Sequence, residues 1–438
     1  ICVSIEFMGK LSNTSAKTPA VLIVEIMDRI YKQGMTTTSG GNVSATDASG
    51  NTWITPAGID KGDLKPSDIV CVKKDGTITG SHLPSSEYPF HKAIYDCRPD
   101  IKAIVHAHPP ALVSFSITGE VPDPLAIFTT QRVCGSVGFA PYAMPGSQAL
   151  GEKVAGEFSK GHNIIIMENH GAVAGGTDIA DAYQRFESLE ICAGALIGAN
   201  ILGKPSYLSH GKFSAFHEAL KYTYPEMEPS GFESSVENKK TEILKFVERG
   251  CRQGLITSAA GTVSLRCDGN SFVVTPANIS NWELQAADIV KITGGKCETG
   301  KTPGHLARLH QAIYESHPGI RAIVMAQPPN LMAFGISGTP FSVNTIPESL
   351  MFLKDVELLP FETDFSKITE LIVSKCETSN ALILRHNAVV TTGNSLLQAY
   401  DRLEIAEFGA KSLIMSKAIG KFKPISRQQA DEIRKMYP

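Results

Sequence analysis

The sequence predicts an α/β protein made of two tandem domains, each with a central sheet flanked by helices. The chain has 438 residues, which is more than one hydrophobic core usually organises. Its two halves repeat each other in sequence. Within each half, apolar residues at helical spacing alternate with short β-branched runs.

The internal repeat extends over almost the whole chain. The segment SGGNVSATDASGNTWITPAG (39–58) returns as SAAGTVSLRCDGNSFVVTPAN, which places Ser44 on Ser264 at a shift of 264 − 44 = 220. HKAIY (91–95) returns as HQAIY (310–314) at a shift of 219. Such slowly changing shifts indicate duplication of a complete domain with small changes in loop length, because solenoid repeats are far shorter.

The joint between the copies lies near 205–235, where Pro, Gly and Ser interrupt the apolar pattern. We therefore predict one domain over 15–215 and a second over 236–425.

Each copy has recognisable helix and strand signals. An amphipathic helix is expected over 18–34, closed by a glycine, and a long helix over 177–203, with Thr177 as its N-cap. The prolines at 109 and 110 end one of the strands. The other expected elements of the first copy are a helix over 88–97 and strands over 51–55, 68–72, 101–108 and 163–168.

Composition excludes several classes of partner. Apolar residues make up 42% of the chain and charged residues 19%, and the net charge of −3 creates no basic field for nucleic acid or an anionic membrane. No apolar run reaches the roughly 18 residues of a membrane span, and ICVSIEFMGK lacks a signal-peptide pattern. The nine cysteines are scattered and never form a C-x-x-C pair. We expect a soluble cytoplasmic protein with reduced thiols.

Three histidines of the first copy suggest a metal site. His106 and His108 lie two apart in an expected strand, so their side chains share one face. His170 follows another buried strand in MENHGA, where the glycine is expected to let the backbone turn tightly. Three imidazoles with one open position are the arrangement of catalytic zinc. An H-x-H pair alone more often lies on a surface or in a satisfied core, so the prediction depends on the combination.

Glu87 in PSSEYPFH is the expected carboxylate partner of these histidines. Its alternative role is an acid at a helix start, favoured by the helix dipole after Ser85 or Ser86 as a cap. The glycines of GGN and TPAG and the two serines offer N–H groups and hydroxyls of the kind that hold phosphate. Taken singly, each is also compatible with ordinary turn chemistry.

Together these motifs resemble one family. SGGNVS, ITPAG, LPSSE, IVHAHPP and ENHG occur in the order and at the spacing typical of the class II aldolase/adducin family. That family includes fuculose-1-phosphate and rhamnulose-1-phosphate aldolases, ribulose-5-phosphate 4-epimerase, methylthioribulose-1-phosphate dehydratase and the adducin head domain. The resemblance implies an α/β/α domain around a mostly antiparallel sheet. It covers about 20–215 strongly and 236–425 more loosely.

The resemblance also implies roles for individual residues. His106, His108 and His170 match the zinc ligands, and Glu87 matches the carboxylate that completes the coordination and moves protons. The residues matching the phosphate-binding loops are Asn42, Gly58, Ser85 and Ser86. The implied function is a zinc-dependent lyase of the aldolase type, which acts on a sugar phosphate or related hydroxy-carbonyl compound through an enediolate. An epimerase or a dehydratase of the same family is the alternative.

The sequence departs from the fuculose-phosphate enzymes at two places. Ala57 replaces a hydroxyl residue of their TPTG loop. In the stretch LAIFTTQ, Ile127 or Phe128 stands where those aldolases carry a catalytic tyrosine.

The second copy lacks the metal-associated residues. At the repeat shifts, His106 and His108 fall on Met325 and Gln327, His170 falls on Asn387 and Glu87 falls on Leu306. We therefore expect one zinc per chain, held in the first domain, and a second domain that is a scaffold. His91 is retained as His310, which favours a packing or hydrogen-bonding role for both.

A non-enzymatic interaction module like the adducin head is the alternative class. The intact histidines and Glu87 favour an enzyme. Because single-domain relatives commonly form cyclic tetramers, the resemblance also implies a homodimer that completes a four-domain ring.

Overall fold

The computed structural model describes residues 17–228, 231 and 233–436. The stretch ICVSIEFMGK, from which we expect no targeting signal, lies outside the described residues. The described chain forms two compact units, one of residues 17–124 and 129–194 and the other of 125–128 and 195–436. Residues 195–215, assigned to the first domain on sequence, thus pack with the second unit, and the boundaries 15–215 and 236–425 remain a prediction.

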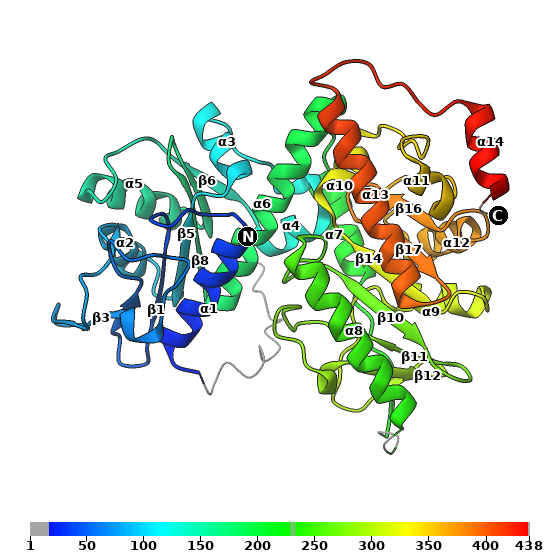
Figure 1. Ribbon diagram of the computed structural model, residues 1–438. Coiled ribbons are helices and arrows are strands. Elements are labelled where there is room, and N and C mark those ends of the chain that lie inside the picture. Colours follow the sequence, from blue (N-terminus) through cyan, green and yellow to red (C-terminus); the bar gives the residue numbers. More distant parts are fainter. Residues whose placement is uncertain (1–16, 229–230, 232, 437–438) are drawn as a thin grey trace. The chain divides into compact units, whose positions relative to one another are not determined.

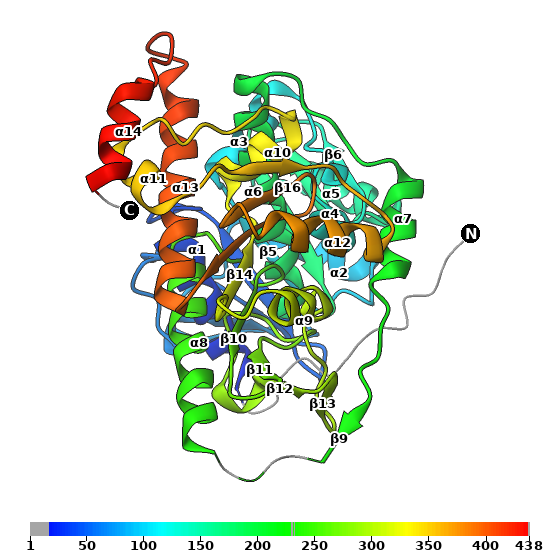
Figure 2. The same ribbon diagram turned by 90° about the vertical axis from the view of Figure 1, so that its right-hand side faces the viewer.

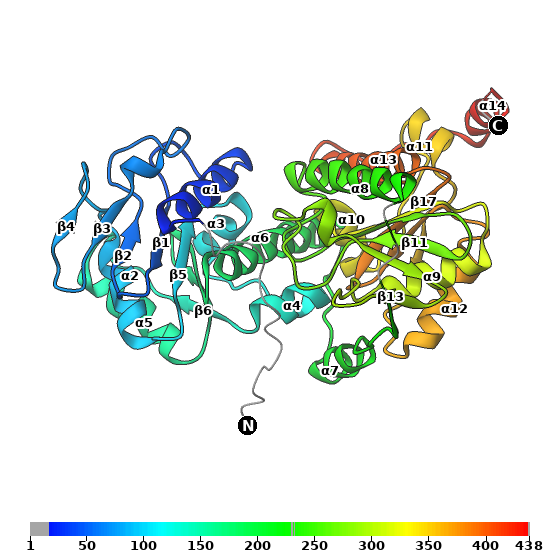
Figure 3. The same cartoon turned by 90° about the horizontal axis from the view of Figure 1, so that it is seen from below.

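The first unit is built around an eight-stranded sheet of order β4-β3-β2-β1-β5-β8-β7-β6. All neighbours are antiparallel except β6 and β7. Figure 3 shows α2 and α5 on one side of this sheet and α1 on the other. The bounds are α1 Pro19–Lys32, β1 Asn42–Thr46, β2 Thr52–Ile54, β3 Val70–Val72, β4 Ile78–Thr79, α2 Tyr88–Cys97, β5 Ala103–Ala107, α3 Pro110–Thr118, α4 Phe128–Cys134, β6 Val137–Ala140, α5 Gln148–Ser159, β7 Ile164–Met167, β8 Gly171–Gly176 and α6 Ile179–Leu202.

The second unit repeats this plan in a nine-stranded sheet of order β15-β16-β17-β14-β10-β11-β12-β13-β9. Figure 2 shows β10 to β13 in succession, with β9 at the edge. The bounds are α7 His210–Ala219, β9 Glu226–Met227, α8 Ser234–Arg252, β10 Thr262–Arg266, β11 Ser271–Val274, β12 Val290–Thr293, β13 Lys296–Glu298, α9 Ala307–Ser316, β14 Ala322–Ala326, α10 Pro329–Ser337, α11 Pro347–Phe352, β15 Glu357–Leu359, α12 Phe365–Lys375, β16 Ala381–Leu384, β17 Ala388–Gly393, α13 Leu396–Ser416 and α14 Arg427–Met436.

The two sheets have the same strand order and register, apart from the extra β9. Asn42 pairs with His106 between β1 and β5, and Thr262 pairs with Met325 between β10 and β14. The expected fold class, two α/β domains with mostly antiparallel sheets flanked by helices, is confirmed. The register also shows that Met325 occupies the position of His106 in its own sheet.

The helix ends follow from local chemistry, with one correction. Helix α1 ends as expected, because Gly34 adopts φ +69° and its N–H donates to the carbonyl of Tyr31. The expected N-cap of the long helix was wrong. Asp178, not Thr177, accepts a hydrogen bond from the N–H of Asp181 in the first turn of α6. The Thr177 N–H and hydroxyl both donate to the Asp181 carboxylate instead.

Apolar residues from the sheet and from α2 and α5 form the core on one face of the first sheet. Phe90 and Ile94 of α2 and Val154 and Phe158 of α5 pack on Ile104 of β5, and all five are almost fully buried. Burial of side chains of this size stabilises the fold by about 1.5–3 kcal/mol each. This packing positions the start of α2, which carries Glu87, against the end of β5, which carries His106. Figure 1 shows α2 and α5 side by side.

In each domain a glutamate carboxylate contacts the start of a helix; Glu407 is buried and Glu190 is half-buried. Glu190 accepts hydrogen bonds from the N–H groups of Ala111 and Leu112 at the start of α3. Glu407 accepts them from the N–H groups of Asn330 and Leu331 at the start of α10. Burial raises the pKa of both carboxyl groups to about 7 despite these hydrogen bonds.

These carboxylates should make stability depend on pH. Because the folded-state pKa of Glu407 lies above its ordinary value of 4.5, folded protein holds a proton that unfolded chain has released. The protonated Glu407 therefore contributes to the free energy of unfolding fully below about pH 4.5, and this contribution is lost as the pH rises through about 7. Glu407→Gln should remove this pH dependence. The difference in unfolding free energy between variant and parent should therefore change by about 3 kcal/mol between about pH 4.5 and pH 8. Denaturant titrations at about pH 4.5 and pH 8 measure it.

The exposed Glu432 offers a matched control, and Glu432→Gln should leave the pH dependence unchanged. If Glu407→Gln behaved like Glu432→Gln, the buried carboxylate would not be protonated in folded protein at neutral pH.

Within the described residues, no helix is both long enough and apolar enough to cross a lipid bilayer.

Candidate metal centre

Three histidine side chains of the first unit converge at one end of its sheet. His106 is the fourth residue of β5 and is fully buried, while His108 follows the end of that strand by one residue. His170 lies in the tight turn between β7 and β8. The ring centroids lie 4.8 Å apart for His106 and His108, 4.9 Å for His106 and His170, and 5.2 Å for His108 and His170. The structure thus brings together the three histidines that the sequence singled out.

Glu87 completes this cluster. Its Oε2 lies 3.1 Å from Nε2 of His106, and its Oε1 lies 3.1 Å from Nε2 of His170. Glu87 stands at the N-cap position of α2, but its side chain makes no capping hydrogen bond. The carboxylate therefore faces the imidazoles and not the helix start that was its alternative role.

Glycines let two segments approach the cluster closely. A Cβ on Gly40 would lie 2.9 Å from Nδ1 of His108, and a Cβ on Gly41 would lie 2.9 Å from the carbonyl oxygen of His106. A Cβ on Gly171 would lie 2.6 Å from the carbonyl oxygen of Ala107. The expectation that Gly171 makes the tight turn was wrong, because Asn169 has the positive φ, at +52°. Gly171 is required for close approach between β8 and the end of β5.

The protonation states suit a metal site. Burial, followed by the nearby imidazoles of His106 and His170, lowers the pKa of His108 to about 3. Burial alone would raise the pKa of Glu87, but the nearby imidazoles of His106 and His170 outweigh it and hold that pKa well below its usual range. At neutral pH the site therefore offers a neutral His108 and an ionised Glu87, the forms that ligate metal.

The residues present fit a zinc ion. One ligand nitrogen from each histidine lies within 4.8 Å of the others. Nε2 of His106 and of His108 and Oε1 of Glu87 are buried and have no hydrogen-bond partner within the described chain. Nδ1 of His106 lies 2.9 Å from the carbonyl oxygen of Ala172. When Nδ1 carries the proton and donates it to this carbonyl, Nε2 is left unprotonated and can ligate a metal. Imidazoles oriented in this way, with one carboxylate, are typical donors for zinc.

The loops expected to hold phosphate lie beside one another. Pro56 and Pro84 form a β-bridge, and the N–H of Ser85 donates to the carbonyl of Thr55. Gly58 and Ser86 are exposed. Ser85 is buried, and its Oγ accepts a hydrogen bond from the N–H of Glu87. Ser85 and Ser86 lead directly into Glu87, the residue that faces the histidines.

Asn42, the fourth residue expected at phosphate, is placed differently. Its side chain is buried, with Nδ2 donating to Oε2 of Glu87 at 2.7 Å and Oδ1 lying 2.5 Å from Nε2 of His91. The other ring nitrogen of His91 lies 2.7 Å from Oγ of Ser44. The expected hydrogen-bonding role of His91 is confirmed. Its connection to Glu87 was missed, because no sequence motif shows which atoms meet across the sheet.

The second unit has no equivalent cluster among its described residues. Met325 and Gln327 occupy the positions of His106 and His108, and Nε2 of Gln327 donates to the carbonyl of Asn387. Gly304 and His305 take the places of Ser85 and Ser86 at the bridge between Pro276 and Pro303. The second copy has thus lost the hydroxyls of this loop as well as the metal donors.

Ile127 and Phe128, one of which is expected at the place of the aldolases' tyrosine, are both buried in the second unit. Phe128 packs against Leu208 and Phe216, and its N–H donates to the carbonyl of His386. Neither side chain offers a transferable proton.

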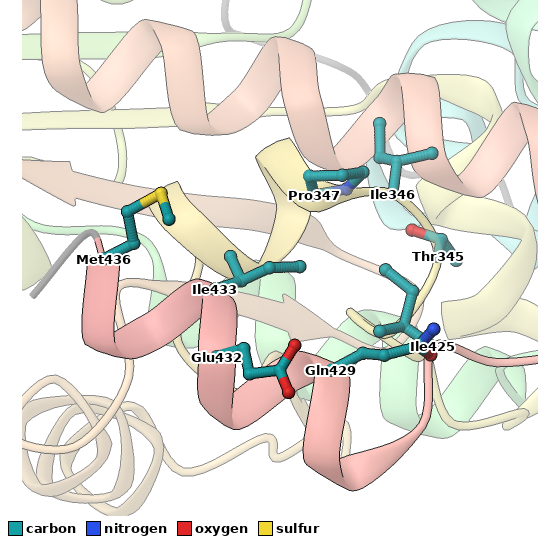
Figure 4. Close-up of a pocket in the computed structure, with 8 residues that line it drawn as sticks. All are labelled: Thr345, Ile346, Pro347, Ile425, Gln429, Glu432, Ile433 and Met436. Carbon is teal, nitrogen blue, oxygen red and sulfur yellow. The ribbon is translucent and has the colours of Figure 1, made fainter.

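One pocket, of about 550 Å³, lies in the second unit between α14 and the segment leading into α11 (Figure 4). Ile346, Pro347, Ile425, Ile433 and Met436 make much of its wall apolar. Because no cluster of metal-ligating or nucleophilic side chains lines it, the pocket is not a candidate active site.

The fold is an α/β domain present twice, and the cluster of three histidines and one carboxylate is present in the first copy and replaced in the second. The model of the class II aldolase and adducin N-terminal domain family matches residues 21–197 and again 241–414. The chain therefore belongs to this family and carries its domain twice.

Relatives in this family catalyse different reactions. A 3-oxo-tetronate 4-phosphate decarboxylase of Haemophilus influenzae is 30% identical over 174 residues, covering 39% of this chain and 82% of the relative. A 5-deoxy-D-ribulose 1-phosphate aldolase of Bacillus thuringiensis is 32% identical over 190 residues, covering 42% and 87%. An L-fuculose phosphate aldolase of Methanocaldococcus jannaschii is 32% identical over 169 residues, covering 38% and 89%.

Among solved structures, an L-fuculose 1-phosphate aldolase is 28% identical. The alignment covers 49% of this chain and 100% of the other, with a TM-score of 0.43.

Proposed function

We propose that this protein is a zinc-dependent lyase that cleaves a carbon–carbon bond in a sugar phosphate or a related hydroxy-carbonyl compound. The active site lies in the first domain, where His106, His108 and His170 hold the zinc and Glu87 moves the proton. Gly58, Ser85 and Ser86, with the loop that ends at Asn42, bind the phosphate. The second domain is a non-catalytic scaffold.

The observation that carries this proposal is the shared geometry of three imidazoles and one carboxylate. The ligand nitrogens lie within 4.8 Å of one another, and Glu87 lies 3.1 Å from two of the rings. All four residues are replaced together in the second copy. Only one copy retains these buried ligand atoms, and it retains them as a group. Metal chemistry explains this better than packing does.

Bound zinc would supply a Lewis acid that polarises the substrate's carbonyl and stabilises negative charge on an enediolate. Glu87 is ionised and mostly buried. Asn42 holds its Oε2, and its Oε1, which lies 3.1 Å from Nε2 of His170, would accept the proton. Ser86 precedes Glu87 in the chain, and the loop of Gly58 pairs with this segment through the bridge of Pro56 and Pro84. The exposed Gly58 and Ser86 would orient the phosphate of the substrate. This orientation places the reacting carbon near Glu87.

Decarboxylation of a 3-oxo sugar acid phosphate is the second candidate. Two observations favour it, namely the decarboxylase relative at 30% identity and the absence of a hydroxyl at Ile127 and Phe128. Loss of carbon dioxide leaves the same kind of enolate as aldol cleavage, but it needs no group to take up the hydroxyl proton that is released when an aldehyde leaves. Epimerisation and dehydration by the same site would release neither an aldehyde nor carbon dioxide, so the assay below also follows loss of the starting compound.

A panel assay tests the proposal. Zinc-loaded protein is incubated with ketose 1-phosphates and with 3-oxo acid 4-phosphates, and release of aldehyde and of carbon dioxide is followed separately. Aldehyde release supports the aldolase, and carbon dioxide release supports the decarboxylase. Turnover of neither class, with zinc bound, would point to an adducin-like interaction module.

We also propose a homodimer, in which two chains supply the four domains of a ring. The duplication supports this arrangement, because one tandem chain replaces two single-domain subunits, and two-fold symmetry is the commonest form of soluble homo-oligomer. Light scattering should give a mass near twice the 47.1 kDa of one chain. A mass equal to that of a single chain would contradict the ring.

A further inference from the structure

A buried chain of hydrogen bonds leads from Glu87 into the sheet. Asn42 Nδ2 donates to Glu87 Oε2 at 2.7 Å, and Asn42 Oδ1 lies 2.5 Å from His91 Nε2. His91 Nδ1 lies 2.7 Å from Ser44 Oγ, and Ser44 Oγ lies 2.7 Å from Tyr95 Oη. Asn42, Ser44 and His91 are at most 2% exposed, so water does not compete with these bonds.

The direction of every hydrogen bond in this chain follows from its first member. A carboxylate only accepts, so Asn42 must turn its amide nitrogen toward Glu87 and its oxygen toward His91. That oxygen also only accepts, so His91 carries its proton on Nε2 and accepts at Nδ1 from Ser44. Ser44 in turn accepts from Tyr95. All donors therefore point toward Glu87, and each bond polarises the next.

The second domain keeps the serine, histidine and tyrosine of this network but lacks the asparagine and the glutamate. Ser264 Oγ lies 2.7 Å from both His310 Nδ1 and Tyr314 Oη, as in the first domain. Thr262 takes the place of Asn42 in the strand register. As a result, His310 Nε2 is buried without a partner among the described residues. The Ser–His–Tyr bonds are thus part of the fold, whereas the link through asparagine exists only where Glu87 exists.

We propose that Asn42 and His91 are positioning residues, which hold the Glu87 carboxylate by Oε2 so that Oε1 is presented to the reacting centre. This inference rests on the proposed function. It gives the Asn42 side chain a role other than binding phosphate. Without His91, the Asn42 amide could rotate and present its oxygen to the carboxylate, which would repel Glu87 from its place.

Kinetics of matched variants test the proposal. Asn42→Thr installs the residue that the second domain carries at the same register, so the fold tolerates it there. His91→Gln and His310→Gln remove equivalent imidazoles from the two domains. Asn42→Thr and His91→Gln should each lower kcat by about 10- to 100-fold with little change in KM and zinc content. His310→Gln should leave kcat unchanged.

Two kinetic results would overturn the proposal. A raised KM with unchanged kcat in Asn42→Thr would assign its side chain to phosphate. If His91→Gln and His310→Gln lowered kcat equally, both histidines would have only a packing role.

A measurement without substrate separates this inference from the proposed function. In protein labelled at its histidine nitrogens, the imidazole N–H signal of His91 is assigned by its loss in His91→Gln. Glu87→Gln, which removes charge two hydrogen bonds away, should shift this signal and leave that of His310 in place. An unshifted His91 signal would disprove the connection. A shifted signal in a protein inactive on every substrate would refute only the lyase assignment.

Discussion

Replacing His106 with alanine should remove both the bound zinc and the lyase activity. Parent protein should carry about one zinc per chain, and the variant about none, because two imidazoles and a carboxylate cannot compensate for the buried third ligand. Elemental analysis of purified protein gives the zinc content, and the panel assay gives the activity. A content near two in the parent would contradict the single-site interpretation.

Met325→Ala is the matched control for this experiment, because Met325 holds the same register position in the second sheet. The substitution removes a buried side chain and should lower stability by about 2–5 kcal/mol. The zinc content should not change. Loss of zinc from Met325→Ala as well as from His106→Ala would show that the metal effect is a general consequence of destabilisation.

Glu87→Gln should lower turnover by about 10²- to 10⁴-fold while substrate still binds. Glutamine keeps the shape of the side chain and can still accept from Asn42, but it has neither the charge nor a transferable proton. Steady-state kinetics and product formation under single-turnover conditions measure the effect. The zinc content should be determined in parallel, so that lost chemistry is distinguished from lost metal.

Leu306→Gln at the equivalent position of the second domain should leave turnover unchanged. If Glu87→Gln converted substrate at the parental rate but melted at a lower temperature, Glu87 would have only a structural role at the start of α2.

Much of the fold was predictable because its signals are local. The α2 helix matches the expected range of 88–97, and the expected strands at 51–55, 68–72, 101–108 and 163–168 are all present with shorter bounds. The capping error at Thr177 has a physical cause. Threonine and aspartate are both good N-caps, and only the backbone geometry decides which of two adjacent residues accepts the hydrogen bond.

The sequence by itself determined the duplication, the α/β class and the four residues that meet at the candidate metal centre. These follow from residue identity and spacing, which persist whatever the details of packing. It also showed that the second copy lacks the donors, because a methionine and a leucine stand in their places.

Only the tertiary structure decided what each site residue contacts. Gly171 gives close approach to the end of β5 and not a turn, and Asn42 bonds to Glu87 and His91. Both depend on atoms from strands and helices far apart in sequence, and hydrogen bonds depend on distance and angle to within tenths of an ångström. A sequence pattern specifies the face on which a side chain lies. It does not specify the partner that the packed fold brings to that face.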